Sequence, residues 1–158
     1  MFLTILKEIE DCLKLNKSLK ENSLVKLTWG NASVLSEDGK HVVIKPSGVD
    51  FDEIKFSDLC IIELYTGKLV SGMKPSVDTA IHLEIYKAFP EIKSIIHSHS
   101  KFATSWAQAL RSIPILGTTH ADYGMNMKKI LDSLSSIIFR SIRLIHLIFL
   151  RYFYLVMV

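Results

Sequence analysis

The chain has 158 residues, 49% of them hydrophobic and 22% charged, which is the composition of a globular protein with room for one domain and a core. Residues 124–158 carry five Lys and Arg against one Asp, whereas residues 1–123 carry 14 Lys and Arg against 15 Asp and Glu. The positive charge is therefore confined to the end of the chain. Because it forms no basic stripe with interleaved aromatics, it does not indicate a nucleic-acid-binding surface.

The cysteines and the N-terminus indicate no export. Cys12 and Cys60 stand far apart, in neither a metal-type nor a redox-type spacing, and we expect buried thiols in a reducing compartment. The first 20 residues mix acidic with apolar side chains, without the basic segment and continuous apolar run of a signal peptide. We therefore expect a cytoplasmic protein.

In the first third of the chain, spacing predicts a helix, a turn and a strand. Apolar residues recur every three or four positions over 3–20, which predicts an amphipathic helix. Residues 29–33, WGNAS, are interpreted as a glycine-containing turn. The β-branched run 41–45 predicts a strand, and the Pro-Ser-Gly at 46–48 ends it, since proline cannot donate to a strand ladder.

The second third predicts further strands around a helix. A strand over 59–64 turns back into a short strand at 69–70, and a helix over 79–89 precedes a strand over 94–97. A further helix and a short strand are expected at 101–110 and 113–117. Helices that flank a mostly antiparallel sheet make this an α/β or α+β sandwich.

The end of the chain has a different character. After residue 136 it is almost wholly apolar, interrupted by three arginines and one histidine, and it fits neither the period of a strand nor that of a helix. Its uncharged runs are shorter than the ~18 residues of a membrane span, and it lacks the polar face of a surface helix. We interpret 124–158 as an atypical apolar and basic tail and do not expect a membrane anchor.

Two histidines stand one residue apart in IIHSHS, residues 95–100. Side chains at i and i+2 of a strand point to the same face, so His97 and His99 could present two imidazoles to one ion. Zn²⁺ favours imidazole, and a catalytic site keeps about three protein ligands. The alternative is two ordinary polar residues where a strand ends. Asp78 is either a carboxylate ligand or the cap of the helix that follows, and spacing alone favours the cap.

Three polar turns have groups that bind phosphate. They lie at 30–33, 45–48 and 75–76, where hydroxyls and backbone N–H groups are available and Lys45 adds a positive charge. Ordinary turn chemistry accounts for the same residue types. In a fourth polar cluster, TTHADY at 118–123, Asp122 is either a general acid or base or a solvated loop carboxylate.

Taken together, five segments resemble the class II aldolase/epimerase family in order and spacing. They are LVKLTWGNAS (24–33), VVIKPSGVDF (42–51), KPSVDTAIH (74–82), IIHSHSKFATSWAQAL (95–110) and IPILGTTHADY (113–123). The resemblance implies a class II aldolase-like sandwich. It divides the chain into the N-terminal part of that domain, 1–123, and the tail, 124–158.

The resemblance also implies roles for single residues. It implies one Zn²⁺ per subunit, with Asp78, His97 and His99 at the metal. It implies an acid/base role for Asp122 and a substrate contact for Thr118, beside Thr119. The positions matching those that hold the substrate phosphate are Gly30, Asn31, Lys45, Ser47, Gly48 and Ser76.

The implied activity is the epimerisation of L-ribulose 5-phosphate to D-xylulose 5-phosphate. A retro-aldol step breaks C3–C4, the aldehyde fragment rotates, and the bond re-forms on the opposite face. Asp rather than Glu at position 78 favours this reaction over the alternative, a sugar-phosphate aldolase of the same family. An inactive zinc-binding remnant is the alternative outside enzymes, and an intact family member is expected to be a homotetramer.

The tail departs from the family. A third metal histidine and a second acid/base, a tyrosine, lie beyond position 123 in the family, and nothing in 124–158 matches them. We interpret the tail as sequence that replaces the family's C-terminal part after a truncation or a shift of reading frame.

Overall fold

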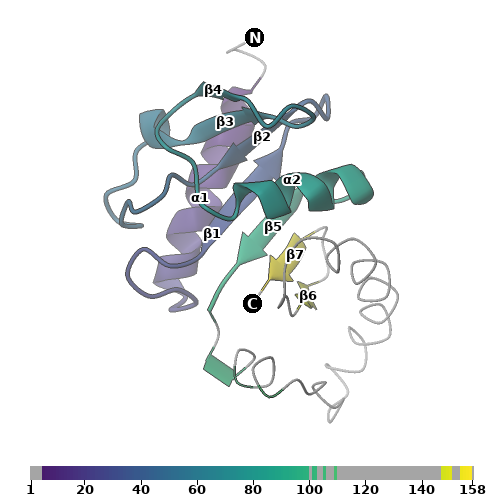
Figure 1. Cartoon of the computed structure of the whole chain (residues 1–158). Helices are drawn as coiled ribbons and strands as arrows, with labels where there is room; N and C mark the ends of the chain where they lie inside the picture. The colour runs from purple at the N-terminus through teal and green to yellow at the C-terminus, as the bar shows by residue number, and fades with distance from the viewer. Residues whose placement is uncertain are drawn as a thin grey trace.

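The computed structural model describes residues 5–99, four positions between 101 and 109, and the segments 147–150 and 154–157. These residues form two α-helices, one short 3-10 helix and one sheet (Figure 1). The helices are α1 (Leu6–Glu21), η2 (Phe56–Asp58) and α2 (Thr79–Ala88). The strands are β1 (Asn31–Leu35), β2 (His41–Ile44), β3 (Cys60–Glu63), β4 (Leu69–Ser71), β5 (Ser94–His97), β6 (Leu147–Leu150) and β7 (Tyr154–Met157).

The described strands form one sheet in the order β4-β3-β2-β1-β5-β7-β6. Every pairing is antiparallel except that of β5 with β7. The mostly antiparallel sheet and the α/β class expected from the sequence are therefore confirmed. β1 lies between β2 and β5, with Ser33 opposite Ile44 and Asn31 opposite His97.

The two helices pack on opposite faces of the sheet, because successive strand residues point to opposite sides. Val34, Val43 and Ile61 belong to the core under α1, whereas their chain neighbours Val42 and Ile62 belong to the core under α2. Figure 1 shows α1 behind the first strands and α2 in front of them. Both faces of β1 and β2 are thereby covered.

One prediction of local structure is wrong. We interpreted residues 29–33 as a turn, but Asn31–Leu35 is a central strand in which every residue is buried. The sequence resembles a turn because Asn31 and Ser33 are polar and follow a glycine. Their side chains are hydrogen-bonded to residues 76–86 on the α2 side of the sheet, and this satisfies them inside a strand.

The other expected elements within the described range are confirmed. The helices expected over 3–20 and 79–89 are α1 and α2, and the strand expected over 94–97 is β5. In the tail, which we expected to fit neither period, two segments pair as β6 and β7. Residues 113–117 and most of 101–110 lie outside the described residues. No helix in the described part of the chain is long and apolar enough to cross a membrane.

Candidate active site

Four ends of elements converge beside the sheet. β1 is antiparallel to both of its neighbours, so its first residue, Asn31, lies next to the last residue of β5, His97. Lys45 directly follows β2 on the other side, and Asp78 directly precedes α2. Segments that lie 47 positions apart in the chain are thereby brought into hydrogen-bonding distance.

A pocket of about 590 Å³ opens at this convergence. All of the site residues proposed from the sequence within the described range line it. They are Gly30, Asn31, Lys45, Ser47, Gly48, Ser76, Asp78, His97 and His99.

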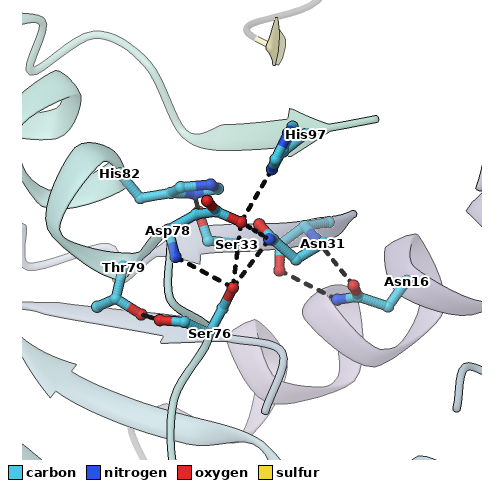
Figure 2. A network of polar contacts seen from close by, with 9 residues as sticks. Asn16, Asn31, Ser33, Ser76, Asp78, Thr79, His82 and His97 are labelled. Atoms are coloured by element: carbon cyan, nitrogen blue, oxygen red, sulfur yellow. Dashed lines mark hydrogen bonds and ion pairs between the residues drawn. The ribbon is translucent and has the colours of Figure 1, made fainter. Parts of the chain in front are cut away.

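The carboxylate of Asp78 connects three of the converging segments (Figure 2). Its Oδ2 accepts hydrogen bonds from Asn31 Nδ2 at 2.8 Å, His97 Nδ1 at 3.0 Å and Ser76 Oγ at 3.3 Å. The hydrogen bond from His97 lowers the pKa of Asp78 to about 2, with a smaller contribution from Asn31. The group is therefore an anion at neutral pH.

The alternative role for Asp78, a helix cap, is wrong. The side chain makes no capping hydrogen bond to the first turn of α2. Instead, Thr79 Oγ1 donates to the backbone oxygen of Ser76 at 2.7 Å and steadies the entry to the helix. The Asp78 carboxylate is thus turned away from the helix end and toward the pocket.

The two histidines lie side by side at the pocket. The ring centroids of His97 and His99 are 4.8 Å apart, and His99 also lies 6.1 Å from the ring of Trp29. Because Asp78 accepts from Nδ1 of His97, the other ring nitrogen, Nε2, keeps its lone pair for a ligand. Partial burial and the neighbouring His97 lower the pKa of His99, which favours a neutral, ligating imidazole.

The described residues include donors that suit a metal ion but do not form a complete metal site. Two imidazoles and a carboxylate fit the donor chemistry of Zn²⁺. However, no group of three His, Cys, Asp or Glu side chains in the described part of the chain lies close enough together to hold an ion. A complete ligand shell therefore needs a further donor or a rearrangement of these side chains.

Lys45, which also lines the pocket, is a buried cation. Its side chain is 1% exposed, and Nζ donates to the backbone oxygens of Val49 at 2.6 Å and Pro46 at 3.3 Å. Nζ also lies 4.6 Å from the centre of the Phe51 ring. Burial lowers the pKa of Lys45. The ammonium thus holds the turn that follows β2 from within.

Backbone hydrogen bonds join two of the polar turns. The N–H of Ser47 donates to Lys74 O at 2.9 Å, and the N–H of Ser76 donates to Lys45 O at 3.2 Å. The amide N–H groups of Asn31 are used by Ser76 and Asp78. The Ser76 hydroxyl is likewise committed, since it donates to Asp78. An anion here would therefore meet the Ser47 hydroxyl, which also lines the pocket, before these committed groups.

Four further residues line the pocket that we did not propose as site residues: Thr28, Trp29, Pro46 and Val77. Trp29 is 58% exposed although it is a large aromatic residue, and its position directly before Gly30 was the available signal. Asp122, Thr118 and Thr119, the proposed acid/base and substrate contacts, lie outside the described residues.

Comparison with known families gives the relationship. The family model described as Class II Aldolase and Adducin N-terminal domain matches residues 10–134. The chain belongs to this family. The resemblance expected from the five sequence segments is thus confirmed at the level of the family, and with it the class II aldolase fold.

Solved structures of the family have the same fold. An L-fuculose 1-phosphate aldolase is 36% identical, with a TM-score of 0.62 over 66% of this chain and 50% of its own. YgbL from Klebsiella pneumoniae, an aldolase/epimerase/decarboxylase by its provisional name, is 29% identical, with a TM-score of 0.60 over 66% of this chain and 49% of its own. The chain of this class II aldolase-family protein therefore spans about half the length of the structures it matches.

Proposed function

We propose that this class II aldolase-family protein breaks and re-forms a carbon–carbon bond of a sugar phosphate. The specific reaction that we propose is the C4 epimerisation of L-ribulose 5-phosphate to D-xylulose 5-phosphate. The observation that carries the proposal is that one pocket is lined both by the cluster of Asp78, His97 and His99 and by two paired polar turns. Aldol chemistry on a phosphate ester needs both groups close together, one at the reacting carbons and one at the phosphate.

In this proposal His97 and His99 hold a divalent metal, Zn²⁺, with Asp78 beside it. Class II aldolases generally depend on such a metal. When bound, the ion supplies Lewis-acid polarisation of the substrate's carbonyl and hydroxyl oxygens. The hydrogen bond from His97 to Asp78 supports this role, since a carboxylate on the second ring nitrogen orients a ligating imidazole and raises its basicity.

The phosphate end of the proposal consists of the paired turns. Ser47, Gly48 and Ser76 line the pocket there, and the Lys45 ammonium lies beneath the turn. The buried charge favours an anion above it, because few other groups screen it in that environment. Ser76 also lies two residues before the N-cap of α2, near the helix end at which the dipole favours negative charge.

Proton transfer is assigned in part. Breaking C3–C4 requires a base to take the proton of the C4 hydroxyl, and re-forming the bond on the other face requires an acid or base there. We propose Asp122 for one of these roles. Asp78 is a poor candidate for the other, because its low pKa makes it a weak base.

The second candidate reaction is aldol cleavage without epimerisation. It is favoured by the 36% identity to an L-fuculose 1-phosphate aldolase. Asp at position 78 and the HADY segment favour the epimerase instead.

A paired assay tests the two reactions. The purified full chain with Zn²⁺ is incubated with L-ribulose 5-phosphate and, separately, with L-fuculose 1-phosphate. Formation of D-xylulose 5-phosphate supports the epimerase, and release of dihydroxyacetone phosphate from the second substrate supports the aldolase. The His97→Gln variant is the control for contaminating enzymes. Stoichiometric zinc without turnover of either substrate would leave a zinc-binding remnant and overturn the proposal.

A further inference from the structure

Side chains of α2 and its N-cap make three polar contacts with β1, two of them on Ser33. The contact at the pocket, hereafter the upper contact, joins Asn31 to Asp78 at 2.8 Å. The contact one helical turn farther along α2, hereafter the lower contact, joins Ser33 Oγ to His82 Nδ1 at 2.7 Å. Figure 2 draws these four residues. The two strand residues are two positions apart and share a face. Asp78 and His82 are four positions apart, and the backbone bond from His82 N to Asp78 O shows that one helical turn joins them.

The two contacts hold α2 on β1 at two points, because each joins a different residue of the strand to a different residue of the helix or its N-cap. A rotation or a slide of α2 by one residue would break both. The lower contact therefore constrains where the upper one, at the pocket, can lie.

The lower contact is wholly inside the protein. Ser33 and His82 are 0% exposed, and Ser33 Oγ also meets the hydroxyl of Tyr86, itself 1% exposed, at 2.9 Å. Nε2 of His82 is buried and has no hydrogen-bond partner among the described residues. Burial lowers the pKa of His82 to about 3, so the ring is neutral at physiological pH.

Stability alone does not account for this arrangement. A buried nitrogen without a partner destabilises the folded state, and an apolar side chain of similar volume would avoid that loss. What an apolar side chain would not supply is a directional contact one helical turn below Asp78. We therefore attribute the Ser33–His82 contact to its effect on the orientation of α2 relative to β1.

We infer that His82 is a positioning residue, which through Ser33 fixes α2 on β1 and so aims the Asp78 carboxylate at His97. The inference deepens the proposed function and rests on it for its catalytic consequence. The positioning itself is a property of the metal-free chain.

The first test uses the metal-free full-length chain with ¹⁵N-labelled histidine. His97 Nδ1–H, held by Asp78, should give a slowly exchanging downfield imidazole proton, assigned by its loss in His97→Gln. In His82→Leu this resonance should disappear. In His82→Asn it should persist, because the Asn amide places a polar atom where Nδ1 lies. Ser33→Ala removes the same contact from the strand side and should also abolish the resonance if His82→Leu does not fold.

The matched control is Ile85→Ala. Ile85 lies on α2, is 1% exposed and belongs to the hydrophobic core, so its truncation lowers the melting temperature without removing the upper or the lower contact. The His97 resonance should survive in this variant. Survival of the resonance in both His82→Leu and Ser33→Ala, its equal loss in Ile85→Ala, or its absence from the unsubstituted chain would each overturn the inference.

The catalytic consequence is measured separately. In His82→Leu, kcat should fall by about tenfold or more while KM changes by less than about twofold, the size of effect typical of groups that orient a metal ligand. His82→Asn should recover most of the loss. If the unsubstituted chain lacks turnover but the resonances behave as expected, the proposed function fails and the positioning stands. If the chain turns over, the resonance survives in both His82→Leu and Ser33→Ala, and kcat is unchanged in His82→Leu, the positioning fails alone.

Discussion

At the scale of single residues, the Asp78 carboxylate is the acceptor that three hydrogen bonds of the site share. One of its oxygens accepts from an amide, a hydroxyl and an imidazole. The three donors lie on β1, on the turn before α2 and on β5. All three hydrogen bonds therefore form only when these segments are correctly placed relative to one another. Its low pKa follows from the same contacts, since hydrogen bonds to the charged form favour ionisation.

Replacing Asp78 by Asn should weaken zinc binding about 10- to 100-fold. The neutral amide removes the negative charge that accepts the hydrogen bond from His97 Nδ1 and orients the ring. Competition with a chromogenic chelator gives the affinity. Asp52→Asn is the matched control, since the Asp52 side chain is 75% exposed and lies outside the pocket. Equal zinc affinity in the two variants would contradict the role of Asp78.

The neutral, buried His82 should make stability depend on pH. Its pKa in the folded state, about 3, is below the ordinary value of 6.5, so the unfolded chain binds the proton more readily. The folded state is therefore fully favoured above pH 6.5, and its advantage falls as the pH drops from 6.5 toward 3. The slope for one such group is at most about 1.4 kcal/mol per pH unit.

Urea unfolding at pH 7.5, 5.5 and 4.5 measures this slope. The His82→Asn variant has no group that titrates at this position and should lose stability less steeply over the same range. Identical slopes for the two proteins would show that His82 does not contribute.

At the scale of elements, the residue that precedes β1, Gly30, lies close to the end of β5. Gly30 has φ +89°, and a Cβ added there would lie 2.7 Å from the backbone oxygen of His97 and 2.8 Å from a methyl group of Val25. Neither contact can be relieved without moving a strand end or a core side chain. The absence of a side chain at Gly30 therefore allows β1 to lie close to His97, which is paired with Asn31.

Gly30→Ala should destabilise the protein by about 2 kcal/mol or more and displace His97. The expected loss combines the left-handed backbone with the clash. Gly39→Ala is the matched control, because Gly39 has φ +68° but open space around an added Cβ, and should lose only about 1 kcal/mol. Urea unfolding compares the two, and the His97 imidazole resonance reports the displacement. Equal losses would mean that the clash is relieved elsewhere.

At the scale of the whole molecule, the pocket joins segments from residue 28 to residue 99, and any ligand bound there stabilises the whole arrangement. A ligand that binds only the folded state adds stability in proportion to the logarithm of its concentration over Kd. The matched part of this chain covers about half of each related structure. A binding test is therefore informative, because ligand binding can be measured without catalytic turnover.

Zn²⁺ at about 100 times its Kd should raise the free energy of unfolding by about 2.7 kcal/mol, and EDTA should reverse the gain. Thermal unfolding monitored by circular dichroism measures it. His97→Gln should abolish the shift, whereas His41→Gln, at a histidine outside the pocket, should keep it. Equal shifts in both variants would place the ion elsewhere.

The homotetramer implied by the resemblance stays a prediction, and light scattering after size exclusion tests it.

Much of the fold followed from local pattern. The helices α1 and α2 and the strand β5 were predicted from the spacing of apolar residues, which reflects burial on one face of an element. β1 was missed because its polar residues are satisfied by α2 and the turn before it, which are more than 40 positions away. No local pattern records such partners.

The candidate site, like the fold, was predicted from the sequence only in part. The chemistry of His97, His99 and the polar turns was visible in the sequence, because ligand types and turn residues are properties of single side chains. Whether Asp78 capped a helix or faced the histidines was not visible, since both roles suit an Asp at a helix start.

The sequence by itself determined the family, the class of fold and the types of groups at the site, because motifs and the periodic spacing of apolar residues are local features of the sequence. Only the tertiary structure decided that Asp78 is turned into the pocket, that Lys45 holds a turn from beneath, and that His82 lies one turn below Asp78 against Ser33. These facts depend on the register of antiparallel strands and on one helix packed across them. Register is set by the summed burial of both faces of the sheet, to which residues from the whole described chain contribute.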